Sequence, residues 1–487
     1  MRRLLGPVLA ACIPLVAGCD LAPEYKVPAV PKPVAFKEGG PWKAANPSDG
    51  IPRGSWWTAY GDGTLDTLEA QVDPSSPTLA AAVARYDQSR AYAAMAEAYL
   101  FPFIDLEGSS TRNRQSADRP LRSKNQPNRF GDNLIGAGAT YELDLWGAVR
   151  NSVAAGEMSA QAQAADLESV RLSLHAELAN DYVTLRGLDA QVKLLQDTVE
   201  GYDQALKLTQ TRFEGKIASI IDVTRAQTQL SSARASVSNV LASRALYEHA
   251  IASLIGKPAS DFSIPPALVD MKIVATPPGL PSTLLERRPD VAAAERRVAA
   301  ANAEVGVARA AFYPNITLNL MGGFQNSLQS GFLAAPYSFW SVGPQFILPV
   351  FEGGLLEAQE AAAYGRLKET SEQYRATVLG AFAEVEDQLA LLHHLEQESV
   401  EVDAAVTAAK ATLDGSLNLY RDGAVNYLDV VEAQQAALVE ERSQLDVKTR
   451  RLGASVRLIR ALGGGWSTAD LPSRDEVGVI DVSDRKD

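Results

Sequence analysis

Several kinds of residue are scarce in this chain of 487 residues, and each scarcity narrows the classes of protein to which it can belong. Only two cysteines are present, so a disulfide framework is not expected. The 46 basic residues are outnumbered by 59 acidic ones, and nucleic acid is therefore not an expected partner. Apart from a stretch near the N-terminus, no segment approaches the run of about 18 apolar residues that a membrane-spanning helix requires. If the chain crosses a membrane, it must do so as β-strands.

Proline is absent from two long windows, 128–257 and 350–471, although prolines are frequent elsewhere. Because proline breaks helix interiors, these windows can hold very long helices. Apolar residues from Leu185 to Phe213 recur at alternating steps of three and four, which is the spacing of a coiled-coil seam. Residues 402–420 repeat this spacing less regularly. A helix from Leu145 to Phe213 would be about 100 Å long, which predicts a rod rather than an ordinary globular domain.

A fifteen-residue signature occurs twice in the chain. Residues 213–227 read FEGKIASIIDVTRAQ and residues 420–434 read YRDGAVNYLDVVEAQ. The offset of 207 also relates Gly256 to Gly463, so the register holds to the end of each copy. A tandem duplication with structurally equivalent copies is therefore predicted.

The N-terminus has the pattern of a bacterial lipoprotein signal. Two arginines precede an apolar stretch at 4–16, and Val16-Ala17-Gly18 leads into Cys19, as in a lipobox. We expect cleavage before Cys19, lipidation of that residue and loss of Cys12 with the signal. The formal net charge then moves from −13 to −15, because two arginines and no acids are removed. The alternative is a plain secretory signal with an incidental cysteine.

Four segments alternate between apolar and polar residues, at about 103–112, 133–143, 315–323 and 339–348. Each would be a strand with one apolar and one polar face. A half-buried sheet on a soluble core would show the same pattern, but the coiled-coil seams and the lipid anchor favour a transmembrane barrel with a polar lumen. Because bacterial barrels start at about eight strands, the wall must be shared among several chains.

The segment between the first two strands, 112–129, is basic, with Asp118 as its one acid. This loop either contacts lipopolysaccharide phosphates or is simply a solvated charged loop. The corresponding segment of the second copy, 326–338, is uncharged. The basic residues of the first loop are Arg112, Arg114, Arg119, Arg122, Lys124 and Arg129.

The most specific motif is LPSTLLERRPDVAAAERRVAAANAEVGVARAAFYPNITL at 280–318. It is joined by APEYKVP at 22–28, WWTAYGDGTLDTL at 56–68 and YELDLWG at 141–147. With these motifs, nearly the whole mature chain resembles the TolC-like outer-membrane efflux channels, in particular their NodT-type lipoprotein branch.

The resemblance implies a mostly α-helical protein with a transmembrane β part: a homotrimer with one shared twelve-stranded barrel and a coiled-coil periplasmic tunnel of twelve helices. Drugs or other small solutes would pass through it from an inner-membrane pump of the RND type and a periplasmic adaptor. The protein would lie in the outer membrane, anchored in its lipid at Cys19. A type I secretion channel shares this fold, and a lipid-anchored periplasmic coiled-coil scaffold is the alternative of a different class. Asp20 resembles an inner-membrane retention signal of enteric lipoproteins, but a barrel should follow its own assembly route.

These features divide the chain into six parts. They are a lipoprotein signal peptide at 1–18, an extended anchor segment at 19–63, a first repeat at 64–258 with a helical hairpin at about 145–256, a proline-rich linker at 259–280, a second repeat at 281–465 with a hairpin at about 352–463, and a flexible tail at 466–487.

The resemblance places the two signatures at the periplasmic tips of the hairpins, where the tunnel narrows and the adaptor docks. It assigns an apolar and acidic constriction to Leu428, Asp429 and Glu432, and their counterparts in the first copy are Asp222 and Arg225. The alternative is that Asp222 and Asp429 only cap helices.

Adaptor contacts are expected at Gly215, Lys216, Asp422 and Gly423. Gly423 supplies the backbone freedom of a tight turn, whereas Lys216 stands where glycine is usual. The first turn is therefore expected to differ from the second.

No enzyme signature is recognisable. His393 and His394 are adjacent rather than spaced as a helical metal pair, and His175 and His249 are isolated, so all four are expected on helix surfaces. The paired acids Glu142 and Asp144 are expected to line the lumen. Catalysis, metals and cofactors are therefore not expected.

Overall fold

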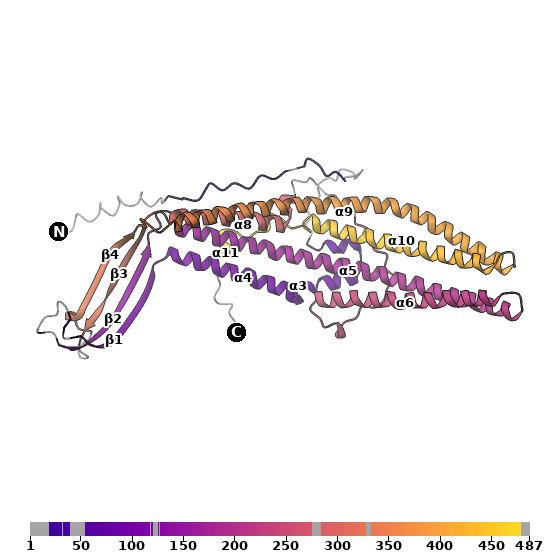
Figure 1. Ribbon diagram of the computed structural model, residues 1–487, viewed down its shortest axis with the longest axis horizontal. Helices are drawn as coiled ribbons and strands as arrows, with labels where there is room; N and C mark the ends of the chain where they lie inside the picture. Colours follow the sequence, from indigo (N-terminus) through magenta and orange to yellow (C-terminus); the bar gives the residue numbers. More distant parts are fainter. Residues whose placement is uncertain are drawn as a thin grey trace.

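The computed structural model describes residues 19–31, 33–38, 54–116, 118–119, 125, 127–274, 284–327 and 333–478. The predicted signal peptide at 1–18 and two basic loop residues, Arg122 and Lys124, lie outside these ranges. The molecule is elongated, with a β-sheet at one end and the turns of two helical hairpins at the other (Figure 1).

Four long helices form the two hairpins. The first consists of α5 (Ala148–Glu214) and α6 (Ile220–Leu254), and the second of α9 (Leu355–Arg421) and α10 (Tyr427–Ala461). All four helix starts and ends differ between the copies by 207, as in 355 − 148, which is the offset of the sequence signatures. The 67 residues of α5 correspond to about 100 Å. These helices run unbroken because the windows that hold them lack proline.

Two further helices thicken the half of the rod next to the sheet. Helix α4 (Pro77–Glu97) packs on α5, and α8 (Pro289–Ala310) packs between α5 and α9. Both begin at a proline, whose fixed φ and missing N–H suit the first helical position. Within the described ranges, no helix is both long and apolar enough to cross a bilayer. The short elements are η2 (Trp56–Tyr60), α2 (Gly63–Glu69), α3 (Val72–Ser75), η3 (Ala98–Leu100), η4 (Ala259–Asp261), α7 (Leu284–Arg287), η6 (Ala335–Tyr337), η7 (Thr468–Asp470) and α11 (Arg474–Gly478).

The sheet is an antiparallel meander of four strands in the order β1-β2-β3-β4. Its register aligns Ile104, Ala139, Leu320 and Val342 in one row across all four strands. Because side chains alternate between faces, the rows of this parity form one apolar face, while Asp105, Glu107 and their row partners form the other. Strands β1 and β4 each leave one edge unpaired within the chain. The strands are β1 (Phe103–Arg114), β2 (Arg129–Glu142), β3 (Asn315–Asn326) and β4 (Ser338–Ile347).

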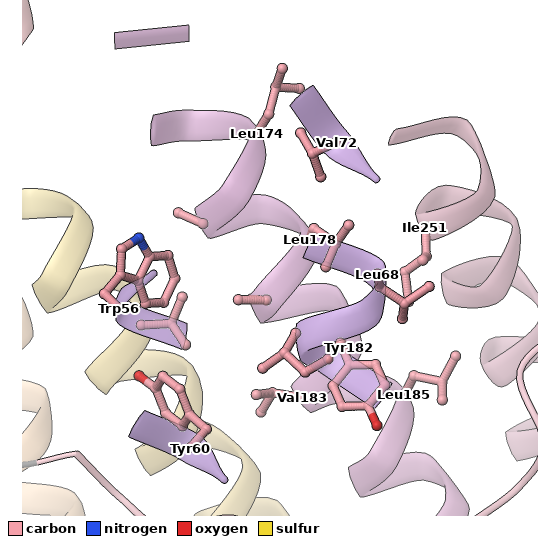
Figure 2. Packing of buried hydrophobic residues seen from close by; sticks show 14 of the residues in the cluster. Trp56, Tyr60, Leu68, Val72, Leu174, Leu178, Tyr182, Val183, Leu185 and Ile251 are labelled. Atoms are coloured by element: carbon pink, nitrogen blue, oxygen red, sulfur yellow. The ribbon is translucent and has the colours of Figure 1, made fainter. Parts of the chain in front are cut away.

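The main core lies midway along the rod, where η2, α2 and α3 pack against the long helices (Figure 2). Tyr60, Leu178 and Tyr182 are essentially inaccessible to solvent. Asp62 caps α2 by accepting the Thr64 N–H at 2.8 Å, and it also accepts the Tyr182 hydroxyl at 2.5 Å. This core fixes the N-terminal helices onto the first hairpin.

A buried ionic network fastens the described part of the predicted linker to the first hairpin. Arg186 donates to Asp189 and to the Pro265 carbonyl, both at 2.8 Å. The second oxygen of Asp189 accepts from Arg244 at 2.6 Å. Because these charges satisfy one another and the linker carbonyls, the ionic groups can be buried without an unpaired charge.

His175 is buried, so its predicted place on the helix surface was wrong. Its Nδ1 lies 2.7 Å from Glu69 Oε2, and its ring stacks on Trp57 at a centroid distance of 4.6 Å. Burial raises the pKa of Glu69 to about 7. The sequence around His175 in α5 does not indicate that Glu69 of α2 packs against it, and for this reason its burial was not predicted.

Two other expectations also need correction. Asp144 lies beyond the end of β2 and caps α5, accepting the Val149 N–H at 3.1 Å, so it does not line the lumen from the strand. The tail expected to be flexible is packed up to α11, where Val477 is buried and Gln161 donates to the Pro472 carbonyl at 2.8 Å.

Candidate functional site

The predicted constriction and adaptor-contact residues lie in the two hairpin tips, which are neighbours at the end of the rod farthest from the sheet (Figure 1). The first turn joins α5 to α6 through residues 215–219, and the second joins α9 to α10 through residues 422–426. The two tips share a hydrophobic cluster that includes Tyr202, Leu230, Tyr427 and Val430. The sequence signatures are therefore brought together in space.

The two turns have the same backbone structure, which contradicts the expectation that the first would differ. The Ile217 N–H donates to the Arg212 carbonyl at 2.8 Å, and the equivalent Ala424 N–H donates to the Leu419 carbonyl at 2.8 Å. This bond closes a Schellman motif, which needs a residue with positive φ after the helix. Gly423 has φ 80° and Lys216 has φ 56°. The lysine thus adopts the left-handed conformation that glycine adopts in the second copy.

Replacement of Lys216 by glycine is expected to stabilise the first tip. The left-handed conformation costs a residue with a Cβ about 1–2 kcal/mol, whereas the added freedom of glycine in the unfolded chain costs about 0.4–1 kcal/mol. Local opening of the turn should therefore become about two- to fivefold rarer, measured as slower hydrogen exchange of the tip amides. The matched variant Gly423→Lys should speed exchange in the second tip. Faster exchange in Lys216→Gly would contradict the assignment of strain to this residue.

Asp222 and Asp429 both take part in capping helices. Asp222 Oδ2 accepts the Ser219 N–H at 3.0 Å, while the Ser219 hydroxyl accepts the Asp222 N–H at 3.2 Å. Asp429 and Asn426 form the same reciprocal pair at the start of α10. These capping boxes satisfy N–H groups that a helix start leaves unpaired.

The three residues assigned to the constriction share one exposed side of α10. Leu428 is 38% exposed, and Asp429 and Glu432 are also exposed, whereas the intervening Val430 and Val431 are buried in the tip cluster. An exposed leucine can narrow a passage by packing, and the two exposed carboxylates beside it can attract cations. In the first copy, Arg225 lies 4.0 Å from Asp222 on its own helix.

Arg212 joins the two tips and was missed in the sequence analysis. Its guanidinium donates to the Tyr420 carbonyl and lies over the Tyr420 ring at 4.6 Å. The Tyr420 and Tyr427 rings are 5.4 Å apart, and burial raises the pKa of Tyr427 to about 12. The signal for Arg212 was its mismatch with Leu419, its counterpart at the offset of 207.

A groove of about 380 Å³ lies between the two hairpins, next to their tips. Its lining is mixed, with Leu194, Tyr202 and Leu417 alongside the polar Gln434 and Glu441. The groove lies between α5 of the first hairpin and α9 and α10 of the second.

Comparison with known proteins identifies the family. A family model described as Outer membrane efflux protein matches residues 70–257 and 280–464, one match for each repeat. The chain is 30% identical over 471 residues to the pyoverdine export outer membrane protein OpmQ of Pseudomonas aeruginosa, covering 95% of this chain and 97% of the relative. It is 28% identical over 466 residues to the cation efflux system protein CusC of Escherichia coli, with 94% and 98% covered. The solved structure of the outer-membrane channel OprN superposes with a TM-score of 0.86 at 27% identity, covering 92% of this chain and 100% of that one.

A sheet with one apolar face, joined to paired coiled-coil hairpins, defines a TolC-like outer-membrane channel. The chain belongs to the outer membrane efflux protein family. It is the outer-membrane channel of a tripartite efflux system, whose other components are a periplasmic adaptor and an inner-membrane pump, and it is not an enzyme.

Proposed function

We propose that three copies of this chain form one closed barrel and one continuous tunnel through which small solutes leave the cell. The observation that carries this proposal is the four-stranded sheet with one apolar face and two unpaired edges. An unpaired edge cannot lie in lipid, and four strands are too few to close on themselves. In a meander of four, β4 runs antiparallel to β1, so β4 of one copy can pair with β1 of the next and continue the alternation. Three copies supply twelve strands.

The same symmetry brings six hairpins into one periplasmic tube. Leu428, Asp429 and Glu432 would then meet their copies at the tips as an apolar ring beside an acidic one. Asp222 and Arg225 of the first hairpin would stand between them, which places opposite charges on alternating hairpins. Such a ring narrows the passage by packing and favours cations by its charge.

The adaptor would contact the tip turns at Gly215, Lys216, Asp422 and Gly423, which are exposed at the end of the rod. The groove between the hairpins gives an adaptor helix a second contact surface. The pump would be of the RND type. The relatives' names refer to cargoes as different as pyoverdine and cations. We therefore assign the choice of solute to the pump and adaptor rather than to the channel wall.

Cys19 would be the lipid anchor. Its backbone N–H donates to the Leu145 carbonyl at 2.9 Å, at the junction of the sheet and the helices, where a lipid headgroup level is expected. An N-acylated cysteine keeps one N–H, so lipidation is compatible with this bond. Asp20 is held beside it by Asn151 at 3.0 Å, and this hydrogen bond lowers the pKa of Asp20. The Asp20 side chain, at the position that resembles a retention signal, is thus hydrogen-bonded within the protein.

Replacement of Cys19 by alanine is expected to abolish lipid labelling and to leave most of the protein inserted in the outer membrane. The physical reason is that burial of the apolar strand face, and not the acyl chains, would hold the barrel in place. Labelling with a radioactive fatty acid and membrane fractionation measure the two effects separately. Complete loss of outer-membrane protein would show that the anchor, and not the strands, holds it there.

The mass of the detergent-extracted protein tests the proposed assembly. Light scattering should give three chains per particle, with a far-UV spectrum that is mostly helical and has a strand minority. A stable monomer in mild detergent would contradict the proposal.

A further inference from the structure

The far end of the sheet carries three arginines on the face that is apolar nearer the helices. In β1, Arg112 and Arg114 have the same parity as Ile104 and Leu106, so all four side chains lie on one face. The register places Arg129 of β2 directly opposite Arg114. The three residues therefore form one cluster, which we call the arginine cluster, at the end of the sheet remote from the helices (Figure 1).

No acidic residue shares the face of the arginine cluster within the described strands. Asp105, Glu107 and Asp132 have the opposite parity. All three arginines are exposed. Like charges directly opposite each other destabilise a strand pair, so an anion between or beside Arg114 and Arg129 would stabilise this pairing.

The height of the arginine cluster matches a lipid headgroup layer. Arg112 and Arg114 lie eight and ten residues beyond Ile104, which is about 26–33 Å along a strand. At the tilt of about 40° that is usual in barrels, this is about 20–25 Å of height, and the apolar band of such barrels is about 25 Å tall. The guanidinium groups would thus leave the hydrocarbon layer at its outer boundary.

We propose that Arg112, Arg114 and Arg129 bind phosphate groups of a phosphorylated glycolipid in the outer leaflet of the membrane. Guanidinium groups match phosphate oxygens in bidentate geometry, and each basic residue near a charged lipid surface adds to the attraction. The inference rests on the proposed barrel, because the apolar face must point to lipid. The second repeat has no such cluster, since Phe324 and Asn326 stand at the positions of β3 equivalent to Arg112 and Arg114. Each chain thus offers one site, and a trimer offers three.

The test compares lipid binding by a triple variant, Arg112→Gln with Arg114→Gln and Arg129→Gln, with binding by the wild type. The matched control removes three exposed arginines from the helices, by Arg234→Gln, Arg366→Gln and Arg442→Gln. Native mass spectrometry of the full detergent-extracted assembly, titrated with bisphosphorylated lipid A, gives the affinity. The triple variant should bind about tenfold or more weakly than the wild type, and the control should be unchanged. Dephosphorylated lipid A should bind the wild type as weakly as bisphosphorylated lipid A binds the triple variant.

Equal affinity of the triple variant and the wild type would overturn the proposal and leave the cluster as a solvated charged surface. Equal binding of lipid A with and without phosphate would overturn it too, and competition by inorganic phosphate at equal concentration would show that a free anion is the ligand instead. If the triple variant does not assemble, Arg112→Gln and Arg129→Gln alone should each weaken binding by about fivefold. Light scattering of the wild type reports separately on the trimer, so failure of the proposed assembly is distinguished from failure of this site.

Discussion

Single prolines placed in turn at Leu106, Glu107 and Gly108 of β1 are each expected to reduce the assembled outer-membrane protein severely. Backbone N–H groups of successive strand residues point alternately to the two neighbouring strands. If β1 pairs with β2 on one side and with another chain on the other, every proline removes a ladder bond. In lipid each backbone group left without a hydrogen bond costs several kcal/mol, so proline should not be tolerated at any of the three positions.

The scan separates an internal strand from a free edge. A free edge tolerates proline wherever the N–H faces solvent, so β1 as a true edge would show alternating tolerance. Ala334→Pro is the control, because this loop residue has φ −83°, close to the value proline imposes. β1 is preferred over β4 for the scan because β4 already contains Pro344 and forgoes one N–H there. Alternating tolerance, measured as oligomer recovered from outer membranes, would contradict the shared barrel.

The double variant Leu428→Ala with Glu432→Ala is expected to conduct better than the wild type and to be blocked less by multivalent cations. The leucine narrows the passage and the glutamate supplies part of the acidic ring. Exposed pairs contribute only about 0–1 kcal/mol each, so either change alone should loosen the gate little. Glu432 is preferred over Asp429 because Asp429 also accepts the Asn426 N–H, and its loss would unravel the start of α10.

Planar-bilayer recording measures both effects. The control Val439→Ala with Glu440→Ala removes the same kinds of side chain from the same helix, about two turns farther from the tip. It should leave conductance and block unchanged. If the Leu428 and Glu432 double variant also behaves as the wild type, the constriction lies elsewhere in the tunnel.

The long helices could be predicted from the sequence because their signals are local. The absence of proline and the spacing of apolar residues by three and four indicate where α5 and α9 can run. Because the chain is duplicated, the start and end of a helix in one copy predict those of its counterpart in the other. The strands were predicted within a few residues by alternation alone, but their pairing required the structure. Register joins β2 to β3 across more than 170 residues of chain, and no local pattern specifies such a contact.

The site was predicted only in part, for a similar reason. The spacing on α10 places Leu428 and Glu432 together, because residues four apart share a helix face. The contact that Arg212 makes between the tips depends on Tyr420, which lies in the other hairpin, and Glu69, the partner of His175, lies in α2. Side-chain chemistry at one position does not show which distant element packs on it. The left-handed Lys216 shows the converse case, in which the shared hairpin geometry overrides an unfavourable local residue.

The measurement that tests the account most directly is disulfide trapping between the two sheet edges. In a Cys12→Ser and Cys19→Ser background, Leu106→Cys in β1 is combined in turn with Trp340→Cys, Val342→Cys or Phe346→Cys in β4, and the membranes are oxidised. Within one chain these positions are separated by two further strands, about 14 Å, which exceeds the reach of a disulfide. If three chains share one closed barrel, at least one pair should give covalent bands of two and three chains and nothing larger. Uncrosslinked chains from all three pairs, or a ladder extending beyond three chains, would contradict a closed trimeric barrel.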